Sequence, residues 1–314
     1  MDKKTILVIT GPTATGKSAL AVALAHALNG EVISADSMQI YRGMDIGTAK
    51  ITPAEAEGVP HHMIDVAGPE EDFSVGRYVE LAARCADDIL SRGRTPILAG
   101  GTGLYIDSLL AGTDFAAAPG DSDLRQQLSA EYDALGAEAM WEKLRAVDPD
   151  RAAKLAPADK KRVLRALEVY LLTGETITEH DARTRALPPR YPSVRFALTW
   201  NDREALYRRI DERVDRMLEQ GLLSEVEGLL RRGVSPNSTA MQAIGYKEIA
   251  AALRGECSMD EAVDTVKRES RRYAKRQLTW LRRDGGLHWL PREEFPELPA
   301  LLAQISFVLR QEPT

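Results

Sequence analysis

The stretch GPTATGKS, residues 11–18, decides the fold class. It fits the pattern G-x-x-x-x-G-K-[ST], whose glycines let the backbone fold around an anion with its N–H groups directed inward. An apolar run, TILVIT (5–10), precedes it, and an alanine-rich run that predicts a helix follows it. This context favours a true phosphate site over an incidental glycine-rich turn. The predicted phosphate-binding residues are Gly11, Pro12, Thr13, Ala14, Thr15, Gly16, Lys17 and Ser18.

Other segments extend the pattern in both directions from this loop. EVISA (31–35) and TPILA (95–99) have the composition of buried strands, and a helix is predicted from Ser74 to Arg92. Strands that alternate with helices predict an α/β parallel sheet, here a P-loop NTPase-like core flanked by helices.

The pattern changes after about residue 120, where three helical runs follow one another without a convincing strand. A proline-rich passage then leads into VRFALTW (194–200), which is again typical of a strand. We therefore expect a core formed by residues 1–112 and 191–314, interrupted by an all-helical insertion at residues 113–190. Two later helix starts are marked by capping-box spacing, Asn201 with Glu204 and Ser258 with Glu261.

Composition bounds the class of protein. Of the 314 residues 44% are hydrophobic and 28% charged, as in ordinary globular proteins, and no apolar run approaches the ~20 residues that span a bilayer. The apolar run at residues 5–10 leads directly into the glycine loop, so it is interpreted as a buried strand rather than as part of a signal peptide. Two cysteines without a CxxC pair, Cys85 and Cys257, argue against disulfides and cysteine zinc sites, and favour the cytoplasm.

The companions of a nucleotide triphosphatase are hard to find. D-V-A-G (65–68) matches a GTPase motif formally, but no N-K-x-D for guanine follows, and TPILA ends in Gly100-Gly101-Thr102-Gly103 rather than an acid. The best-placed carboxylate is Asp36, after the second strand. Because ligands of open α/β sheets bind beyond the carboxyl ends of the strands, Asp36, the phosphate loop and Gly100–Gly103 should converge on one crevice. The alternative role for Asp36 is a helix or turn cap.

The pair His61-His62, with Asp65 nearby, has residue types found in metal sites. The spacing of His61 and Asp65 aligns ligands only on a helix, and the segment between Pro60 and Gly68 does not read as one. A structural or substrate-lining loop is favoured over a metal site.

Positive charge is concentrated near the C-terminus. Residues 267–283, KRESRRYAKRQLTWLRR, hold eight Lys/Arg and one Glu, although the whole chain has a net charge of −6. A helix there would share one basic face, with Tyr273, Trp280 and Leu281 largely elsewhere as anchors. Either this face is solvated and engaged in salt bridges, or it binds a polyanion such as folded RNA; the scarcity of acids favours RNA. The face comprises Arg268, Arg271, Arg272, Lys275 and Arg276, and a second patch in the insertion comprises Lys160, Lys161, Arg162 and Arg165.

Taken together, these motifs resemble one family, the tRNA dimethylallyltransferases, also called tRNA isopentenyltransferases. The similarity covers the chain nearly end to end and in family order. It runs through GPTATGKS (11–18), DSMQIYRGMDIGTAK (36–50), HHMID (61–65), GGTGLY (100–105), RVLRALEVY (162–170), AIGYKE (243–248) and YAKRQLTWLR (273–282). The C-terminal zinc finger of eukaryotic members has no counterpart, because no Cys or His pairs follow the last helix.

The resemblance implies transfer of a dimethylallyl group from dimethylallyl diphosphate to N6 of the adenosine next to the 3′ side of the anticodon. The substrates would be tRNAs that read codons beginning with U, and the adenosine would be flipped into a channel through the core. The insertion would clasp the anticodon stem-loop, and the enzyme would act as a monomer away from membranes.

The resemblance also implies roles for single residues. The phosphate loop would hold the diphosphate leaving group, with Lys17 and a Mg²⁺ ion on Ser18 neutralising its charge. Arg213 would join this clamp, although a surface ion pair with a neighbouring acid is the alternative. Asp36 would be the base that takes the amine proton, and Thr102 would contact substrate.

The tRNA contacts implied by the resemblance span both predicted parts of the chain, and Lys160 joins them only through its basic patch. Ala243-Ile244 replaces the Cys-Val pair seen in some relatives, a difference without expected consequence. The contacts are Asp36, Ser37, Met38, Gln39, Thr102, Arg125, Lys160, Lys161, Arg162, Val163, Leu164, Arg165, Gln242, Ala243, Ile244, Gly245, Tyr246 and Lys247, with Arg271, Arg272, Lys275 and Arg276 added from the basic face.

Two rival functions stay open on sequence grounds. A small-molecule P-loop kinase with ATP in the loop would explain the core but not the two basic patches. A non-catalytic RNA-binding protein with a relic loop would explain the patches, but not the match at Asp36 and Thr102.

Overall fold

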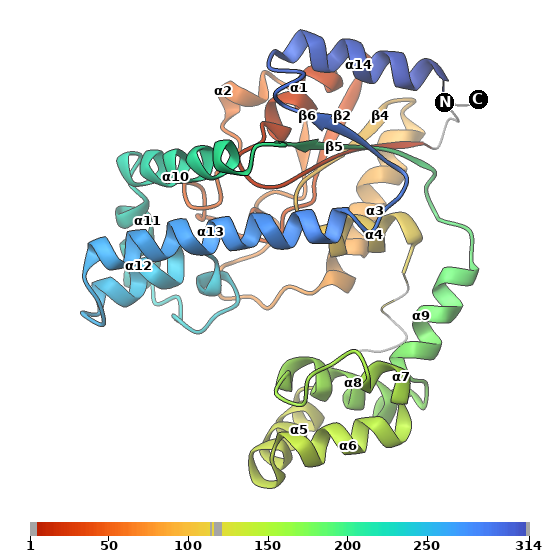
Figure 1. Cartoon of the computed structure of the whole chain (residues 1–314), viewed down its shortest axis with the longest axis vertical. Coiled ribbons are helices and arrows are strands. Elements are labelled where there is room, and N and C mark those ends of the chain that lie inside the picture. The colour runs from red at the N-terminus through yellow and green to blue at the C-terminus, as the bar shows by residue number, and fades with distance from the viewer. Residues whose placement is uncertain (1–4, 114, 116–120, 312–314) are drawn as a thin grey trace. The chain divides into compact units, whose positions relative to one another are not determined.

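The computed structural model describes residues 5–113, 115 and 121–311. Its centre is a six-stranded sheet in the order β3-β2-β4-β1-β5-β6, in which every pairing is parallel (Figure 1). The predicted P-loop-like α/β fold class is therefore confirmed. The strands are β1 (Ile6–Thr10), β2 (Gly30–Ser34), β3 (His61–His62), β4 (Thr95–Ala99), β5 (Ser193–Thr199) and β6 (Leu287–Pro291).

Strand β1 lies in the interior of the sheet, and all five of its residues are buried. Leu7 and Ile9 belong to the apolar core that β5 forms with α1 (Lys17–Leu28) and α14 (Leu298–Gln311). A parallel strand covered on both faces has no solvent side, which is why TILVIT reads as a continuous apolar run rather than an alternating one.

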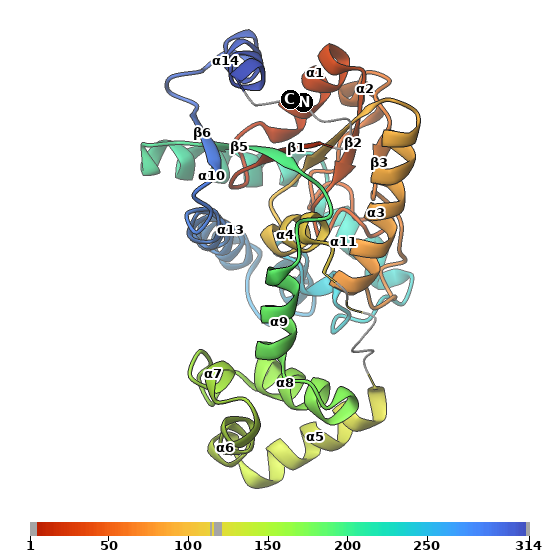
Figure 2. The same ribbon diagram turned by 90° about the vertical axis from the view of Figure 1, so that its right-hand side faces the viewer.

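Helices cover both faces of the sheet. Figure 2 shows α1 and α14 along one side and α4 (Gly103–Ala111) and α13 (Met259–Leu281) along the other. A further apolar core joins the loop after β2 to the helices that follow β5. The remaining helices of this part are α2 (Pro53–Ala56), α3 (Val75–Ser91), α10 (Arg203–Glu219), α11 (Leu222–Arg231), the short 3₁₀ helix η1 (Ala240–Gln242) and α12 (Tyr246–Leu253).

The chain divides into two compact units, Met1–Leu110 with Tyr191–Thr314, and Ala111–Arg190. The second unit, as far as it is described, is all-helical, and its own core includes Met140, Leu144 and Val163. The backbone N–H of Tyr191 donates to the carbonyl of Leu110 at 3.3 Å, so the first unit is left and re-entered at neighbouring positions. The helices of the second unit are α5 (Ser122–Leu135), α6 (Ala137–Val147), α7 (Pro149–Ala152), α8 (Lys160–Thr173) and α9 (Ile177–Ala186).

Some local predictions need correction. His61-His62 is a short edge strand rather than a loop, and β6 was not predicted at all. The cap of α10 is Asp202, whose side chain accepts from the N–H of Glu204, and not Asn201. The capping box of Ser258 and Glu261 at the start of α13 is confirmed. None of the described helices is both long enough and apolar enough to cross a membrane.

Candidate functional site

A cavity of about 410 Å³ lies at the carboxyl ends of β1, β2 and β4. The phosphate loop, the turn at 36–39, the loop at 47–49 and the glycines after β4 all line it, as do residues of α10 and α13 and the segment 242–245. The volume falls in the range of about 300–1,000 Å³ that is typical of small-molecule sites. The first unit thus brings together, in one crevice, most of the core residues that the sequence singled out.

The phosphate loop depends on its glycines. Gly11 has a φ of 139°, and a Cβ there would lie 2.3 Å from the carbonyl oxygen of Leu198. Gly16, with a φ of 90°, precedes the first turn of α1, so the first N–H groups of that helix adjoin the loop. Anions bind at such a terminus because its N–H groups have no partner within the helix.

Lys17 and Arg213 are two of the cations that line this cavity. Lys17 donates to the carbonyl of Pro12 at 2.7 Å. Burial lowers the pKa of Lys17 to about 7, with repulsion from Arg213 adding to the effect and the charge of Asp36 opposing it. Burial likewise lowers the pKa of Arg213. Two desolvated cations that repel each other favour a multivalent anion between them.

Arg213 is not in the surface ion pair that its neighbours suggested. Of the nearby acids, Asp211 pairs with Arg271 of α13 at 2.6 Å, and Asp215 pairs with Lys267 at 2.6 Å. The Arg213 guanidinium instead lines the cavity.

Asp36 occupies a tight turn after β2. Its Oδ1 accepts a hydrogen bond from the N–H of Met38 at 2.9 Å, so the turn-capping role is real. The N–H of Ser37 donates to Oγ1 of Thr102 at 3.1 Å, which ties this turn to the loop after β4. Among the described residues no hydrogen-bond donor to the second oxygen, Oδ2, is found. One carboxylate oxygen therefore holds the turn, and the other is available to a ligand.

Two residues of α13 at the site were missed at the sequence level. Tyr273 lines the cavity, and burial together with the charge of Asp36 raises its pKa to about 12. The buried side chain of Gln277 accepts from the N–H of Thr13 and donates to the carbonyl of Gly101, each at 3.0 Å. Gln277 thus joins the phosphate loop to the loop after β4. The i, i+4 spacing of the two residues was the available signal, but the surrounding arginines obscured it.

Several residues predicted to contact tRNA also make contacts within the protein. The Gln39 amide accepts from Ser34 Oγ at 3.0 Å and donates to the carbonyls of Thr48 and Ala49 at 3.3 Å each. Tyr246 is fully buried. The side chains of Val163 and Leu164 pack into the core of the second unit, which leaves their charged neighbours as the RNA-facing candidates.

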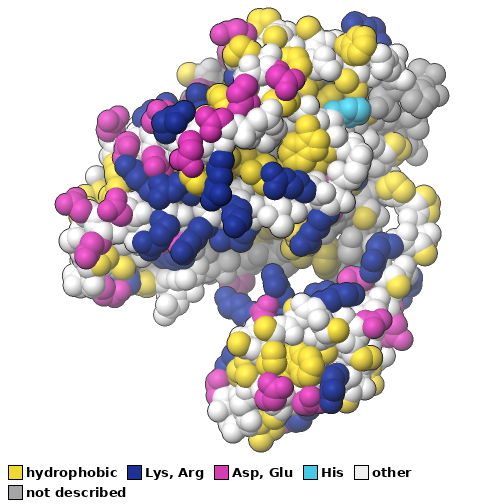
Figure 3. Space-filling model, viewed as in Figure 1, with side chains coloured by type: hydrophobic (Ala, Val, Ile, Leu, Met, Phe, Trp, Pro, Cys, Tyr) yellow, Lys and Arg dark blue, Asp and Glu magenta, His cyan; other side chains and the backbone are white. Residues whose placement is uncertain are grey.

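The basic face of α13 is partly engaged within the protein. Figure 3 shows Lys and Arg side chains gathered over this helix. Arg271 pairs with Asp211, and Arg272 pairs with Glu269 at 2.7 Å. In the described part of the chain Lys275 and Arg276 have no carboxylate partner, and Arg276 lines the cavity. The salt-bridge interpretation therefore holds for Arg271 and Arg272, whereas RNA binding stays a prediction for Lys275 and Arg276.

Four of the basic residues predicted in the second unit have acidic partners. Lys160 pairs with Asp133 at 2.5 Å, and Arg162 pairs with Asp159 at 3.0 Å. Arg125 and Arg165 both contact the buried Glu168 at 2.9 Å. Burial alone would raise the pKa of Glu168, but these two hydrogen-bonded arginines lower it.

The adjacent histidines have a structural explanation. His62 Nε2 lies 2.7 Å from the buried Glu31, which also contacts Arg92 and Arg94. Bonding to Arg92 outweighs burial and lowers the pKa of Glu31 to about 2. No cluster of three or more potential metal ligands is found in residues 5–113, 115 and 121–311.

Comparison with known proteins gives concordant results. A family model described as IPP transferase matches residues 39–284, and one described as isopentenyl transferase matches residues 4–68. The chain is 48% identical over 304 residues to the tRNA dimethylallyltransferase of Acetivibrio thermocellus, covering 97% of each chain. It is 47% identical over 308 residues to that of Geobacter sulfurreducens, covering 98% of this chain and 96% of the relative.

Solved structures agree. The tRNA isopentenylpyrophosphate transferase of Bacillus halodurans superposes with a TM-score of 0.68 at 45% identity, with 92% of this chain and 90% of that chain covered. A eukaryotic dimethylallyltransferase acting on tRNA gives a TM-score of 0.79 at 30% identity, over 92% of this chain and 74% of that one.

Proposed function

This chain belongs to the family of tRNA dimethylallyltransferases, and from that membership we propose how its residues perform the reaction. The enzyme transfers a dimethylallyl group from dimethylallyl diphosphate to N6 of the adenosine 3′-adjacent to the anticodon. The substrates are tRNAs that read codons starting with U, and the products are N6-(dimethylallyl)adenosine and diphosphate.

The observation that carries the proposal is the meeting of Lys17, Arg213 and Asp36 in one cavity. Cations that favour a multivalent anion stand beside a carboxylate with a free oxygen. The reaction requires both: the cations stabilise the diphosphate leaving group, and the carboxylate accepts the proton that the amine loses.

The transfer breaks one bond and forms one. As the allylic C–O bond breaks, the electron pair stays with the diphosphate, whose charge Lys17 and Arg213 stabilise. The adenine N6 bonds to the allylic carbon, and Oδ2 of Asp36 takes the proton that N6 loses. Because Oδ1 is held by Met38, Asp36 enters the reaction in a fixed orientation, which matters more than its modest basicity.

Magnesium fits the oxygen donors on the diphosphate side. Ser18 is exposed in the first turn of α1 and lines the cavity, so its hydroxyl would hold Mg²⁺ together with oxygens of the diphosphate. When bound, the ion would supply positive charge to the leaving group.

The adenosine has to leave its stack to reach a cavity at the sheet edge, so we propose a flipped base. The proposed contacts to the anticodon stem-loop are Lys275 and Arg276 of α13 and the basic residues of α8. The second unit is the proposed clasp. We propose a monomer acting in the cytoplasm, in keeping with two unpaired cysteines, Cys85 and Cys257, in the described structure.

One assay tests the function. The enzyme is incubated with unmodified tRNA, Mg²⁺ and labelled dimethylallyl diphosphate, without ATP, and label is expected in the tRNA. ATP hydrolysis without incorporation would favour the kinase-like alternative. Tight tRNA binding with neither activity would favour the non-catalytic RNA-binding protein.

A further inference from the structure

The loop between β2 and α2 carries the catalytic candidate Asp36 at its start and part of the cavity wall near its end. Asp36 and Gln39 lie in its first turn, and Gly47, Thr48 and Ala49 also line the cavity. Between them the chain has no helix or strand of three residues or more. Such a loop keeps one geometry only if side chains hold it.

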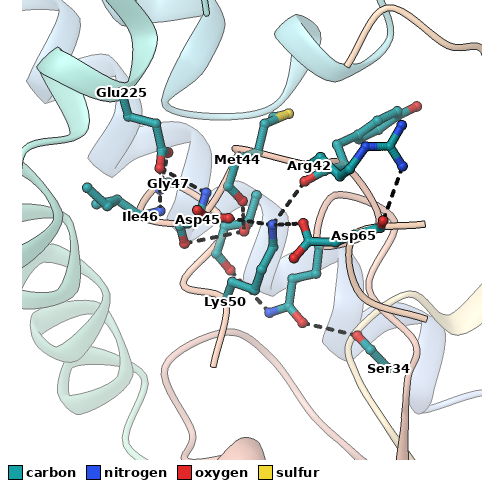
Figure 4. Close-up of polar contacts among 12 residues, drawn as sticks. Ser34, Arg42, Met44, Asp45, Ile46, Gly47, Lys50, Asp65 and Glu225 are labelled. Carbon is teal, nitrogen blue, oxygen red and sulfur yellow. Dashed lines mark hydrogen bonds and ion pairs between the residues drawn. The ribbon is translucent and has the colours of Figure 1, made fainter. Parts of the chain in front are cut away.

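Glu225, from α11, supplies one such hold (Figure 4). Its Oε2 accepts from the N–H groups of Asp45 and Ile46 at 2.9 and 2.8 Å, and its Oε1 accepts from the N–H of Gly47 at 3.1 Å. Three consecutive backbone donors on one carboxylate are charge-assisted bonds, roughly twice as strong as neutral ones. Through Glu225, α11 thereby holds a loop that is distant in sequence: Asp45 and Glu225 are 180 residues apart.

Tyr246 completes this contact from a second side. Its hydroxyl donates to Oε1 of Glu225 at 2.5 Å, and its ring packs directly on Gly47. A Cβ at Gly47 would lie 2.5 Å from a ring carbon of Tyr246, so a larger residue would displace the ring or the loop. The loop approaches this closely only because position 47 is a glycine.

The hold is transmitted to the reacting carboxylate through Gln39. Gln39 Nε2 donates to the carbonyls of Thr48 and Ala49, and its Oε1 accepts from Ser34 at the end of β2. Ala49 has a φ of 45°, a conformation that L-residues rarely adopt and that persists only when the surroundings impose it. If residues 45–47 are released, Ala49 can relax, and Gln39 loses its bonds to Thr48 and Ala49, so the turn at Asp36 is left with its tie to Thr102 and the bond of Gln39 to Ser34.

Lys50 fixes the far end of the loop. Its side chain is 6% exposed, and Nζ contacts the carboxylates of Asp45 and Asp65 at 2.5 and 2.6 Å and the carbonyl of Tyr41 at 2.9 Å (Figure 4). Two charged side chains therefore hold the segment from Asp45 to Lys50: Glu225 binds the backbone at 45–47, and Lys50 binds Asp45, Asp65 and the carbonyl of Tyr41.

We propose that Glu225 is a positioning residue for prenyl transfer, holding residues 45–47 so that Gln39 and the turn at Asp36 keep the reactive geometry. This inference rests on the proposed function, since it assigns the effect to the step in which Asp36 takes a proton. It predicts an effect on turnover, because the phosphate loop that binds the donor is separately held by Gln277.

The test compares Glu225→Gln with Glu227→Gln. Glu227 lies on the same helix, and among the described residues its carboxylate pairs only with the exposed Arg231, at 3.8 Å, so the control makes the same chemical change without touching the loop. Glu225→Gln is expected to lower kcat by about 10- to 100-fold and to change the KM for dimethylallyl diphosphate by less than about threefold. Hydrogen exchange at the amides of 45–47 should accelerate in this variant alone.

Unchanged kcat, or a donor KM that rises in step with the loss of kcat, would overturn the proposal, as would the same loss in the Glu227 control. If Glu225→Gln does not accumulate as folded protein, Glu225→Asp takes its place with the same expectation, because it keeps the charge but withdraws the carboxylate by one methylene. Incorporation of label by the wild-type enzyme is measured alongside. Its absence would refute the transferase function, whereas a normal wild-type rate with an unaffected Glu225 variant refutes only the positioning role.

Discussion

Lys17 combines burial with a neighbouring arginine, so its proton is weakly held when no anion is nearby. Its pKa is lowered from 10.5 to about 7. A lysine with a lowered pKa binds fewer protons folded than unfolded, so its contribution makes the protein more stable as pH rises from the folded to the unfolded pKa. A bound diphosphate reverses the local balance because it favours the charged amine.

Diphosphate binding should therefore be coupled to proton uptake above neutral pH. We expect the affinity for diphosphate to fall as pH is raised from about 6 to about 8, with proton uptake approaching one at the upper end. Calorimetry in buffers of different ionisation enthalpy measures this uptake. Lys17→Arg, which stays charged over the whole range, should lose the enzyme's share of it; equal uptake in both proteins would contradict the assignment.

Asp36 is the residue whose role the geometry sharpens most. Asp36→Asn keeps an oxygen for the N–H of Met38, so the turn should survive the substitution. We expect kcat to fall by about 10²- to 10⁴-fold, the usual contribution of a general base, while tRNA affinity stays within about threefold. Single-turnover kinetics and filter binding measure the two quantities. Equal loss of both would make Asp36 a binding residue.

Some residues of the site could be predicted from the sequence, and others could not. Asp36 and the phosphate loop could be placed because they follow strands, and the ends of parallel strands share one edge of the sheet. Tyr273 and Gln277 could not, because their role depends on how a helix more than 170 residues from the loop after β4 is rotated against it. Gln39 and Tyr246 were predicted to contact tRNA from their place in the family motifs, whereas their side chains form hydrogen bonds to Thr48 and Glu225 within the protein.

Among the elements, α13 does two jobs on different faces. Arg271 ties it to α10, whereas Lys275 and Arg272 are exposed. Charge reversal at Arg271 would therefore disturb the fold as well as any RNA contact, and exposed positions give the cleaner test. The Arg272 pair with Glu269 costs little to break because exposed ion pairs contribute only about 0–1 kcal/mol.

The double variant Arg272→Glu, Lys275→Glu should weaken tRNA binding and lower the slope of log affinity against log salt by about one to two. Titration of tRNA at several salt concentrations measures the slope. The matched control is Arg84→Glu with Arg310→Glu, which makes the same change in net charge at two exposed positions on α3 and α14. A slope that changes equally in the two proteins would assign the effect to net charge rather than to α13.

Interior strands were predictable and edge strands were not. The segments that became β1, β4 and β5 are apolar because neighbours cover both of their faces. The edge strands β3 and β6 are mostly half-exposed, so their composition carries no such signal. Asn201 and Asp202 both have capping side chains, and only the packing of α10 decides which one is used.

For the whole molecule, the insertion should be removable. Leu110 and Tyr191 are joined by a backbone hydrogen bond within the first unit, so the gap that a deletion leaves is short. Replacing residues 112–189 with Gly-Gly should leave a folded protein that binds dimethylallyl diphosphate within about threefold of the full chain and loses tRNA affinity by at least about tenfold. Calorimetry and tRNA filter binding measure the two. Retained tRNA affinity would contradict the clasp assigned to the second unit.

The strand order also has a consequence for synthesis. β5, which pairs directly with β1 in the interior of the sheet, comes from residues 193–199, after the whole insertion. While the ribosome is still adding the insertion, the edge of β1 that later pairs with β5 has no partner strand. Unpaired strand edges of this kind tend to aggregate. The sheet therefore stays incomplete while the second unit, which has its own core, is synthesised. During this interval the nascent chain exposes an unpaired strand edge, and a chaperone that covers such edges would have its largest effect then.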